Sequence, residues 1–403
     1  MAEGDSRIRR FYLFRALTSF TMWMPFWTLW AYENLDSLYL ITVVDAAFWG
    51  TMIGFQIPAG LFGDKYGRKA ALFMGEILFA VGVLAFGLST DFWQYVLSNF
   101  IWALGVCFIV SGDTPFVYDT LLELKRANEF TQVMLTATVV MYFMSAAACA
   151  VAGVIVEVTG RLEITLIAAA LITIVGSFTV FLLQEPKVDR SRMASMTAHF
   201  GVGLRTVLNS RIIIILILFQ IVVEIGVYVM AIFRSIYMNE DLDLSFLWVG
   251  ILFSTFLLVA AVVILCSRRI ESILGEKYSL VFLYAAVFAT FLVVFIVRSP
   301  VAIVMQYLVY VVAGIQGPII NGYINQRVDS EHRSTIMAIA TFAFTALLVV
   351  VEVCVGYVAS AWGLINSLLL LAILSAPIAV TLLAMWGRAL DREKVLQDKA
   401  SAA

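Results

Sequence analysis

The stretch "PAGLFGDKYGRKAAL", Pro58 to Leu72, lies between two long apolar runs and carries a dense set of charges. Gly63 to Lys69 holds four charged side chains and two glycines, while both flanking segments are almost entirely hydrocarbon. Glycine permits the backbone conformations that tight turns require. A short charged turn between two apolar runs of about 20 residues predicts a connection between two membrane-spanning helices.

The composition of the whole chain supports this prediction. Of the 403 residues, 62% are hydrophobic and 13% are charged, whereas about 25% of a soluble domain is charged. A span in lipid must satisfy its own backbone hydrogen bonds, so apolar runs of this length are expected to be helices. The four cysteines form no C-x-x-C pair, which argues against a zinc site or a disulfide framework. We therefore predict an all-α integral membrane protein.

Apolar runs between polar breaks predict twelve spans. They lie at residues 10–32, 38–62, 70–88, 92–122, 130–157, 162–183, 211–237, 244–268, 278–297, 300–325, 333–359 and 362–386. The polar segment after the sixth run divides the chain into two equal sets of spans. The predicted organisation is a six-helix bundle at 1–184, a central loop at 185–210, a second six-helix bundle at 211–388 and a tail at 389–403.

The positions of Lys and Arg predict the orientation of the spans. With the N-terminus inside, 22 of the 26 basic residues fall at inner ends and three at outer ends. Such a bias is the usual mark of the cytoplasmic side. We expect both termini, the central loop and the tail to be cytoplasmic in a multi-pass protein of the plasma membrane.

The two halves repeat one another weakly. "GDKYGRKAAL" (63–72) follows the second span and "ESILGEKYSL" (271–280) follows the eighth, so that Gly67 aligns with Gly275 at an offset of 208. Internal repeats of this kind are common in transporters. They favour two pseudo-symmetric six-helix bundles.

The charged turn resembles the signature of the major facilitator superfamily, G-x-L-a-D-r-x-G-r-k. The matching positions are Gly60, Leu61, Asp64, Gly67, Arg68 and Lys69. "SGDTPFVYDTL" (111–121) and "EHRSTIMAI" (331–339) are similar to segments of a prokaryotic branch of that superfamily. The resemblance implies a transporter whose two bundles rock about a central pore, with the first, fourth, seventh and tenth spans lining the cavity.

The resemblance also implies a cytoplasmic gate that latches the two halves together. Its expected members are Gly60, Asp64, Gly67, Arg68, Lys69, Asp119 and Glu123. Arg68 is expected to bind a carboxylate, with Asp119 and Glu123 as the candidates. Asp64 would face the start of the eleventh span near Arg333 and Ser334. The alternative is a basic loop that only orients membrane insertion.

Ionisable residues inside spans are costly, so they are candidates for coupling or substrate binding. Glu224 lies near the middle of the seventh span, with Gln220 and Tyr228 one turn away on the same face. It is predicted to bind and release a proton, and the alternative is a permanently protonated structural residue. Asp45 and Glu352 lie at similar depths on seam helices of opposite halves.

Arg234 could reach Asp45 and Glu352 and close the extracellular mouth as a carboxylate–arginine–carboxylate gate. The alternative is that each group bonds within its own half. Arg15 could bridge to Asp113 or Asp119, either as a structural pair or as part of a coupling or anion-binding site.

The cavity helices carry aromatic and amide side chains. The predicted cavity residues are Trp23, Trp27, Gln220, Tyr228, Gln316, Asn321 and Asn325. An aromatic wall with few charges suits an amphipathic or aromatic organic solute, including a cation if Glu224 is ionised. Pro25 predicts a bend in the first span.

The predicted function is secondary active transport of a small organic solute by alternating access, coupled to protons, with export favoured. Uncoupled or proton-symporting uptake is the first alternative, and a non-transporting receptor or lipid scramblase on the same fold is the second. No enzyme activity, cofactor, nucleotide or nucleic acid is expected. The expected partners are the solute and the surrounding lipid, with the chain acting as a monomer.

Overall fold

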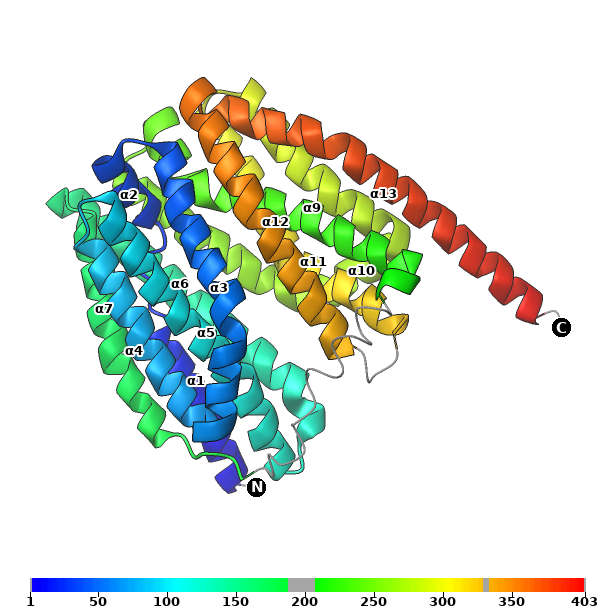
Figure 1. Ribbon diagram of the computed structural model, residues 1–403, viewed down its shortest axis with the longest axis horizontal. Helices are drawn as coiled ribbons and strands as arrows, with labels where there is room; N and C mark the ends of the chain where they lie inside the picture. Colours follow the sequence, from blue (N-terminus) through cyan, green and yellow to red (C-terminus); the bar gives the residue numbers. More distant parts are fainter. Residues whose placement is uncertain (1, 188–206, 329–332, 402–403) are drawn as a thin grey trace.

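The computed structural model describes residues 2–187, 207–328 and 333–401, and the regular elements in these ranges are helices (Figure 1). The first half contains α1 (Ala2–Thr18), α2 (Trp27–Leu35), α3 (Leu38–Tyr66), α4 (Arg68–Gly87), α5 (Phe92–Glu123), α6 (Phe130–Thr159) and α7 (Glu163–Ser177). The second half contains α9 (Arg211–Ile236), α10 (Phe246–Ile296), α11 (Val304–Gln326), α12 (Arg333–Trp362) and α13 (Leu364–Ser401). Most of the predicted central loop, residues 188–206, lies outside the described residues.

Eleven helical segments of the described chain are long and apolar enough to cross a membrane. They coincide with the second to twelfth predicted spans. Two of them, Phe246–Ser267 and Arg269–Ile296, form the single element α10, which bends sharply at Gly275. The prediction of an all-α, multi-pass membrane protein is confirmed.

The first predicted span is broken rather than merely bent. Between α1 and α2 the residues from Ser19 to Phe26 leave the α-helical path. Pro25 has no N–H to donate and disfavours a continuous helix. Other groups take up the freed carbonyls, since the Ser145 hydroxyl donates to the Ser19 oxygen at 3.0 Å. Irregular backbone at membrane depth is tolerated only inside protein or beside a cavity. The break in the first span is therefore a candidate position for a binding site.

Two glycines that the sequence repeat aligns adopt similar turns. Gly67 has φ 109° and ψ 151°, and Gly275 has φ 69° and ψ 170°. A positive φ is strained for any residue with a Cβ. Each glycine reverses the chain between the second and third spans of its half, which accounts for this part of the repeat.

The two halves pack against each other near one end of the molecule, which we call the outer end. Two pairs of helices form this seam, α3 with α12 and α6 with α10. On the first seam the Tyr39 N–H donates to the Ser360 hydroxyl at 2.8 Å. On the second the Leu247 N–H donates to the Glu157 carboxylate at 3.0 Å. These residues begin or end their helices, so the contacts lie at the outer end.

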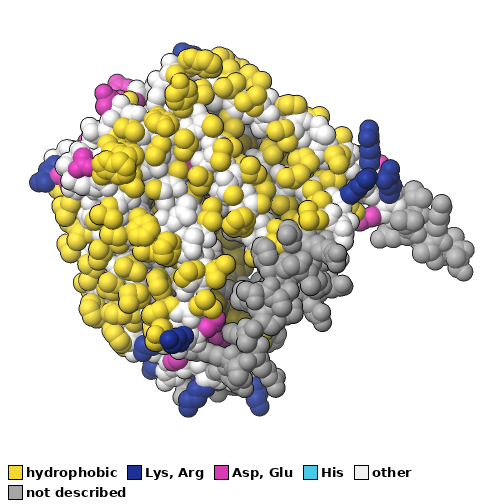
Figure 2. All heavy atoms as spheres, in the orientation of Figure 1, with side chains coloured by type: hydrophobic (Ala, Val, Ile, Leu, Met, Phe, Trp, Pro, Cys, Tyr) yellow, Lys and Arg dark blue, Asp and Glu magenta, His cyan; other side chains and the backbone are white. Residues whose placement is uncertain are grey.

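The helices of the two halves diverge towards the opposite end, which we call the basic end. In Figure 1 the first half runs down to the N-terminus while α13 runs to the right, so the halves meet at the upper left. Figure 2 shows hydrophobic side chains between the ends and groups of Lys and Arg at the bottom and right extremities. Residues 389–401, predicted as a tail, continue α13 as a helix.

Candidate functional site

The charged turn between α3 and α4 is held by ion pairs within the first half. Arg68 follows Asp64 by four residues across the Gly67 turn, and its Nη2 is 2.7 Å from an Asp64 oxygen. Its Nε is 3.6 Å from Oδ2 of Asp119 on α5. Of the two candidate partners predicted for Arg68, the structure selects Asp119. The other candidate, Glu123, binds Arg7 at 3.0 Å.

Glu185, which the sequence analysis did not single out, fixes the beginning of α4. Its two carboxylate oxygens accept hydrogen bonds from the N–H groups of Arg68 and Lys69, both at 2.8 Å. A carboxylate at a helix N-terminus satisfies orphan donors and interacts favourably with the helix dipole. The Lys69 amine donates to the carbonyl oxygens of Phe181 and Leu183, so the turn is tied to the end of the sixth span.

The predicted contact between Asp64 and the start of the eleventh span lies partly outside the described residues. The Arg333 side chain donates to the carbonyl oxygen of Val328 at 3.3 Å, and the side chain of Ser334 lies outside the described residues. Gly60 has open space where a Cβ would stand. Among the described residues, the ion pairs of the charged turn join α3, α4 and α5 of the first half.

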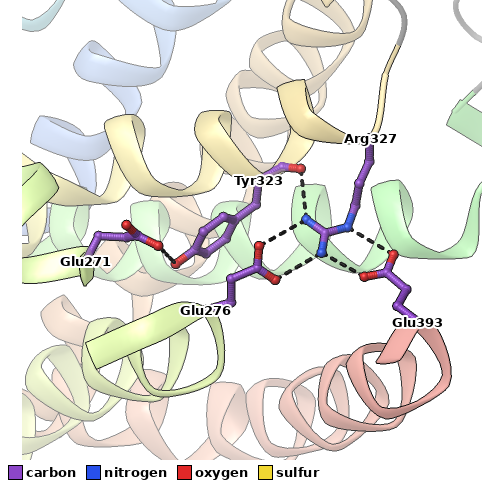
Figure 3. A network of polar contacts seen from close by, with 5 residues as sticks. All are labelled: Glu271, Glu276, Tyr323, Arg327 and Glu393. Carbon is purple, nitrogen blue, oxygen red and sulfur yellow. Dashed lines mark hydrogen bonds and ion pairs between the residues drawn. The ribbon is translucent and has the colours of Figure 1, made fainter. Parts of the chain in front are cut away.

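The second half has its own ionic cluster at the basic end, with the charges reversed (Figure 3). Glu276, which follows the Gly275 turn as Arg68 follows Gly67, binds Arg327 at 2.9 Å. Arg327 also binds Glu393 on α13 at 2.8 Å, and Tyr323 donates to Glu271 at 3.1 Å. A guanidinium between two carboxylates ties α10, α11 and α13 together.

Arg15 lies 3.8 Å from Asp113. The structure thus selects Asp113 rather than Asp119 as its partner. Arg15 also approaches the sulfur of Met141. Both charged side chains are largely buried, at 16% and 13% exposure, which fits the structural pairing considered above.

A cavity of about 270 Å³ lies between the two halves. Trp23 and Trp27, at the break in the first span, line it together with Trp102 and Phe48 from α5 and α3. Trp23 and Trp102 meet edge to face, with ring centroids 4.6 Å apart. The cavity corresponds in volume to roughly nine water molecules. It is the size of a small metabolite.

Asp45 on α3 is one of the cavity's polar groups, and it is bonded to the second half. The Tyr228 hydroxyl donates to Oδ2 of Asp45 at 2.7 Å, and the Trp49 indole N–H contacts both Tyr228 at 2.8 Å and Asp45 at 3.2 Å. Asp45 is 4% exposed. This network joins α3 to α9 across the interface between the halves.

Glu352 on α12 lies opposite Asp45. Helices α3 and α12 run antiparallel along the seam, where Tyr39 contacts Ser360. One turn further along α3, Thr42 lies so close to Gly356 that a Cβ on this glycine would collide with it. The next turn brings Asp45 to Glu352. Glu352 is fully buried, and neither of its oxygens accepts a hydrogen bond from the described residues. Two carboxyl groups from opposite halves therefore face each other at one point of the seam.

Arg234 does not complete the predicted extracellular gate. Its Nε donates to the Gln306 oxygen at 3.2 Å and its Nη1 to the Tyr310 hydroxyl at 2.9 Å. The guanidinium also lies 4.4 Å from the centroid of the Tyr310 ring. No carboxylate among the described residues forms an ion pair with Arg234, because α11 and the aromatic rings of α10 surround it. The expectation of a carboxylate–arginine–carboxylate gate is wrong for this conformation.

Several of the predicted site residues on α9 and α11 do not line the described cavity. Glu224 accepts a hydrogen bond from Gln220 at 3.5 Å, as the helical spacing predicts. Gln220, Gln316, Asn321 and Asn325 do not line the described cavity, although each has a buried side-chain oxygen without a partner among the described residues. Trp102 and Asn99 on α5 do line it, and they were missed because an apolar run gives no sign of which face turns inward.

Comparison with known proteins agrees with this geometry. Residues 11–351 match the Major Facilitator Superfamily. The chain belongs to that superfamily. No curated protein matches the sequence.

Solved structures show the same facilitator fold. A variant of the nucleoside transporter NupG superposes with a TM-score of 0.78 at 14% identity, over 94% of this chain and 99% of that one. A bacterial homolog of the human lysosomal transporter Spinster, in an inward-facing and unoccupied conformation, superposes with a TM-score of 0.75 at 13% identity, over 96% and 97%. At these identities the likeness concerns the fold. This facilitator is a transporter of the same architecture.

Proposed function

We propose that this facilitator exchanges protons for a small organic solute that carries a cationic group. The observation that carries the proposal is the pair of carboxyl groups, Asp45 and Glu352, packed against each other from opposite halves. Asp45 also lines the aromatic cavity. One side chain therefore belongs both to the seam that must open and to the space where a solute would bind.

The pair links protonation to the closure of the outer end. Two ionised carboxylates buried together repel each other, whereas one shared proton lets them pack. Tyr228 and Trp49 donate to Asp45, which leaves Glu352 as the group that needs the proton. Loss of the proton would push α12 from α3 and favour opening towards the outside.

Competition between the solute and the proton for the negative charge of the Asp45–Glu352 pair supports exchange and gives its direction. A cationic group in the cavity would pair best with an ionised Asp45, and faces of Trp23, Trp27 and Trp102 are suited to bind it. A cation at Asp45 and a proton on Glu352 both neutralise the charge of the same pair, so each weakens binding of the other, which is the requirement of antiport. With a proton gradient directed into the cell, exchange drives the solute out, so export is the proposed direction.

The test uses liposomes that contain the purified protein and a trapped pH indicator. Phenyltrimethylammonium, a permanently charged aromatic cation, is added outside. Exchange predicts that the lumen becomes alkaline as the cation enters and protons leave, and symport predicts acidification. Uncoupled uptake predicts cation entry without a pH change. Glu352→Gln should abolish the pH change, and Glu163→Gln, at the outer end of α7, is the matched control. An unchanged signal in Glu352→Gln would refute the proposed role of the pair.

A further inference from the structure

We infer that the solute is a small zwitterion, with its cationic group at Asp45 and its anionic group at Arg234. This inference rests on the proposed function and extends it to the chemical class of the substrate. Among the fourteen residues that line the cavity, Asp45 and Arg234 are the two with opposite charges. They come from different halves, so a solute that bridges them would contact both bundles.

Arg234 is a buried charge without a counter-ion among the described residues. It is 3% exposed, and its hydrogen-bond partners, Gln306 and Tyr310, are both neutral. An arginine inside a membrane protein is costly unless it is paired or serves a pathway. The described residues leave its Nη2 without a hydrogen bond, and the side chain borders the cavity. An anionic group of the solute would supply the missing partner.

The surroundings of Arg234 hold it in place for such a ligand. The rings of Phe253, Phe256 and Tyr310 lie 5.7, 5.8 and 4.4 Å from its guanidinium carbon. These contacts stabilise the cation without neutralising it. A guanidinium with a fixed plane is suited to a forked bond with a carboxylate. The pocket is therefore built for an anion that enters from the cavity side.

The separation of the two charged groups limits the shape of the solute. Tyr228, which binds Asp45, and Arg234 lie six residues apart on α9, or about 9 Å along a helix. Much of the remaining cavity wall is aromatic. A rigid solute with its charges at opposite ends of one ring fits this arrangement better than a solute whose charges share one carbon atom.

Two probes that differ in one group test the inference. Phenyltrimethylammonium carries the cation alone, and 4-(trimethylammonio)benzoate carries the same cation with a carboxylate across the ring. Binding to the full-length protein is measured by calorimetry in detergent. We expect the zwitterion to bind about 10- to 100-fold more tightly than the cation, the range for a charged hydrogen bond in a buried site.

Substitution of the arginine should remove this preference without removing the site. In Arg234→Gln the two probes should bind equally, with the affinity for the cation within about threefold of the wild type. Arg234→Lys should restore part of the preference, since it keeps the charge but not the fork. A thermal melt of each variant checks that it is folded.

The outcomes separate this inference from the proposed function. If the cation exchanges for protons but the zwitterion binds no better than the cation, the inference is wrong and the exchange stands. If the zwitterion binds through Arg234 without any proton movement, the inference stands and the coupling is wrong. If neither probe binds, the assigned site is wrong for both.

Discussion

A single methyl group on Gly250 should open the outer end of the molecule. Gly250 on α10 packs against Gly153 on α6, across the seam between the halves. A Cβ at Gly250 would lie 2.5 Å from the Gly153 Cα and 2.6 Å from the Cys149 carbonyl oxygen. Ordinary contacts between carbon atoms are about 3.5–4.0 Å, so the two backbones must separate by roughly 1 Å. Gly250→Ala therefore disfavours the closed seam.

The size of the effect follows from the cost of overpacking. An added methyl group in a well-packed region costs typically about 1–3 kcal/mol. At about 1.4 kcal/mol for each factor of ten, the ratio of outward-open to closed molecules should rise about 5- to 150-fold. The strain is relieved when α6 and α10 move apart.

The assay measures the rate at which a cavity position reacts with a reagent from the medium. Ala231, which lines the cavity, is replaced by Cys in a protein lacking its four native cysteines, and intact cells receive a membrane-impermeant maleimide. The labelling rate scales with the fraction of outward-open molecules. It should rise with Gly250→Ala.

Two other glycines supply matched controls. Gly317→Ala adds the same methyl group where nothing lies within 4 Å, so it should leave the labelling rate unchanged. Gly82→Ala would collide with the backbone of Trp102 inside the first half, so it should lower the melting temperature without opening the seam. If Gly250→Ala labels no faster than Gly317→Ala, the seam does not control the outer opening and the reasoning is refuted.

Three further predictions concern the basic end. Arg327→Gln leaves two carboxylates facing each other and should lower the stability of the second half by about 1–3 kcal/mol; a thermal melt that matches the wild type would contradict this. Glu185→Ala removes the cap of α4 and should cost about 1–2 kcal/mol, whereas Gln184→Ala, which removes an exposed neighbour, should cost nothing measurable in the same melt. The hydrogen bond from Arg126 lowers the pKa of Asp5. The pair therefore stabilises α1 at pH values above the ordinary pKa range of Asp. This stabilisation is lost as the pH falls through the lower pKa that Asp5 has in the folded protein. The protection factors of the α1 amides against hydrogen exchange should therefore fall below about pH 4, and unchanged protection factors down to pH 3 would contradict the pairing.

Local spacing accounts for the site contacts that could be predicted. Gln220 and Glu224 lie one helical turn apart and meet. Asp64 and Arg68 also lie four residues apart and meet, although the turn at Gly67 separates their helices. Arg68 reaches Asp119 because the two residues lie at the same ends of adjacent helices. In these cases sequence separation or shared depth limits the possible partners to one or two.

The contacts that involve helix rotation could not be predicted. Arg234 was expected to meet Asp45 and Glu352 because all three lie near the outer end. The structure turns it towards Gln306 and Tyr310. Depth follows from counting residues along a span, whereas the direction of a side chain depends on how the helix is rotated against its neighbours. An apolar run surrounded by lipid and protein carries little sign of that rotation.

The amino-acid sequence determined the class of this protein, because runs of apolar residues in lipid have to become helices and a turn such as the one at Gly67 needs a residue without a Cβ. It also determined the order of the spans along the chain and the repeat between the halves. Tertiary packing decided which buried polar groups meet, most clearly in bringing Asp45 and Glu352 together from positions 307 residues apart. It also decided that Arg234 borders the cavity without an ion-pair partner among the described residues. The reason is physical: hydrophobicity acts on each segment separately, whereas a pair of buried charges exists only when two helices have packed.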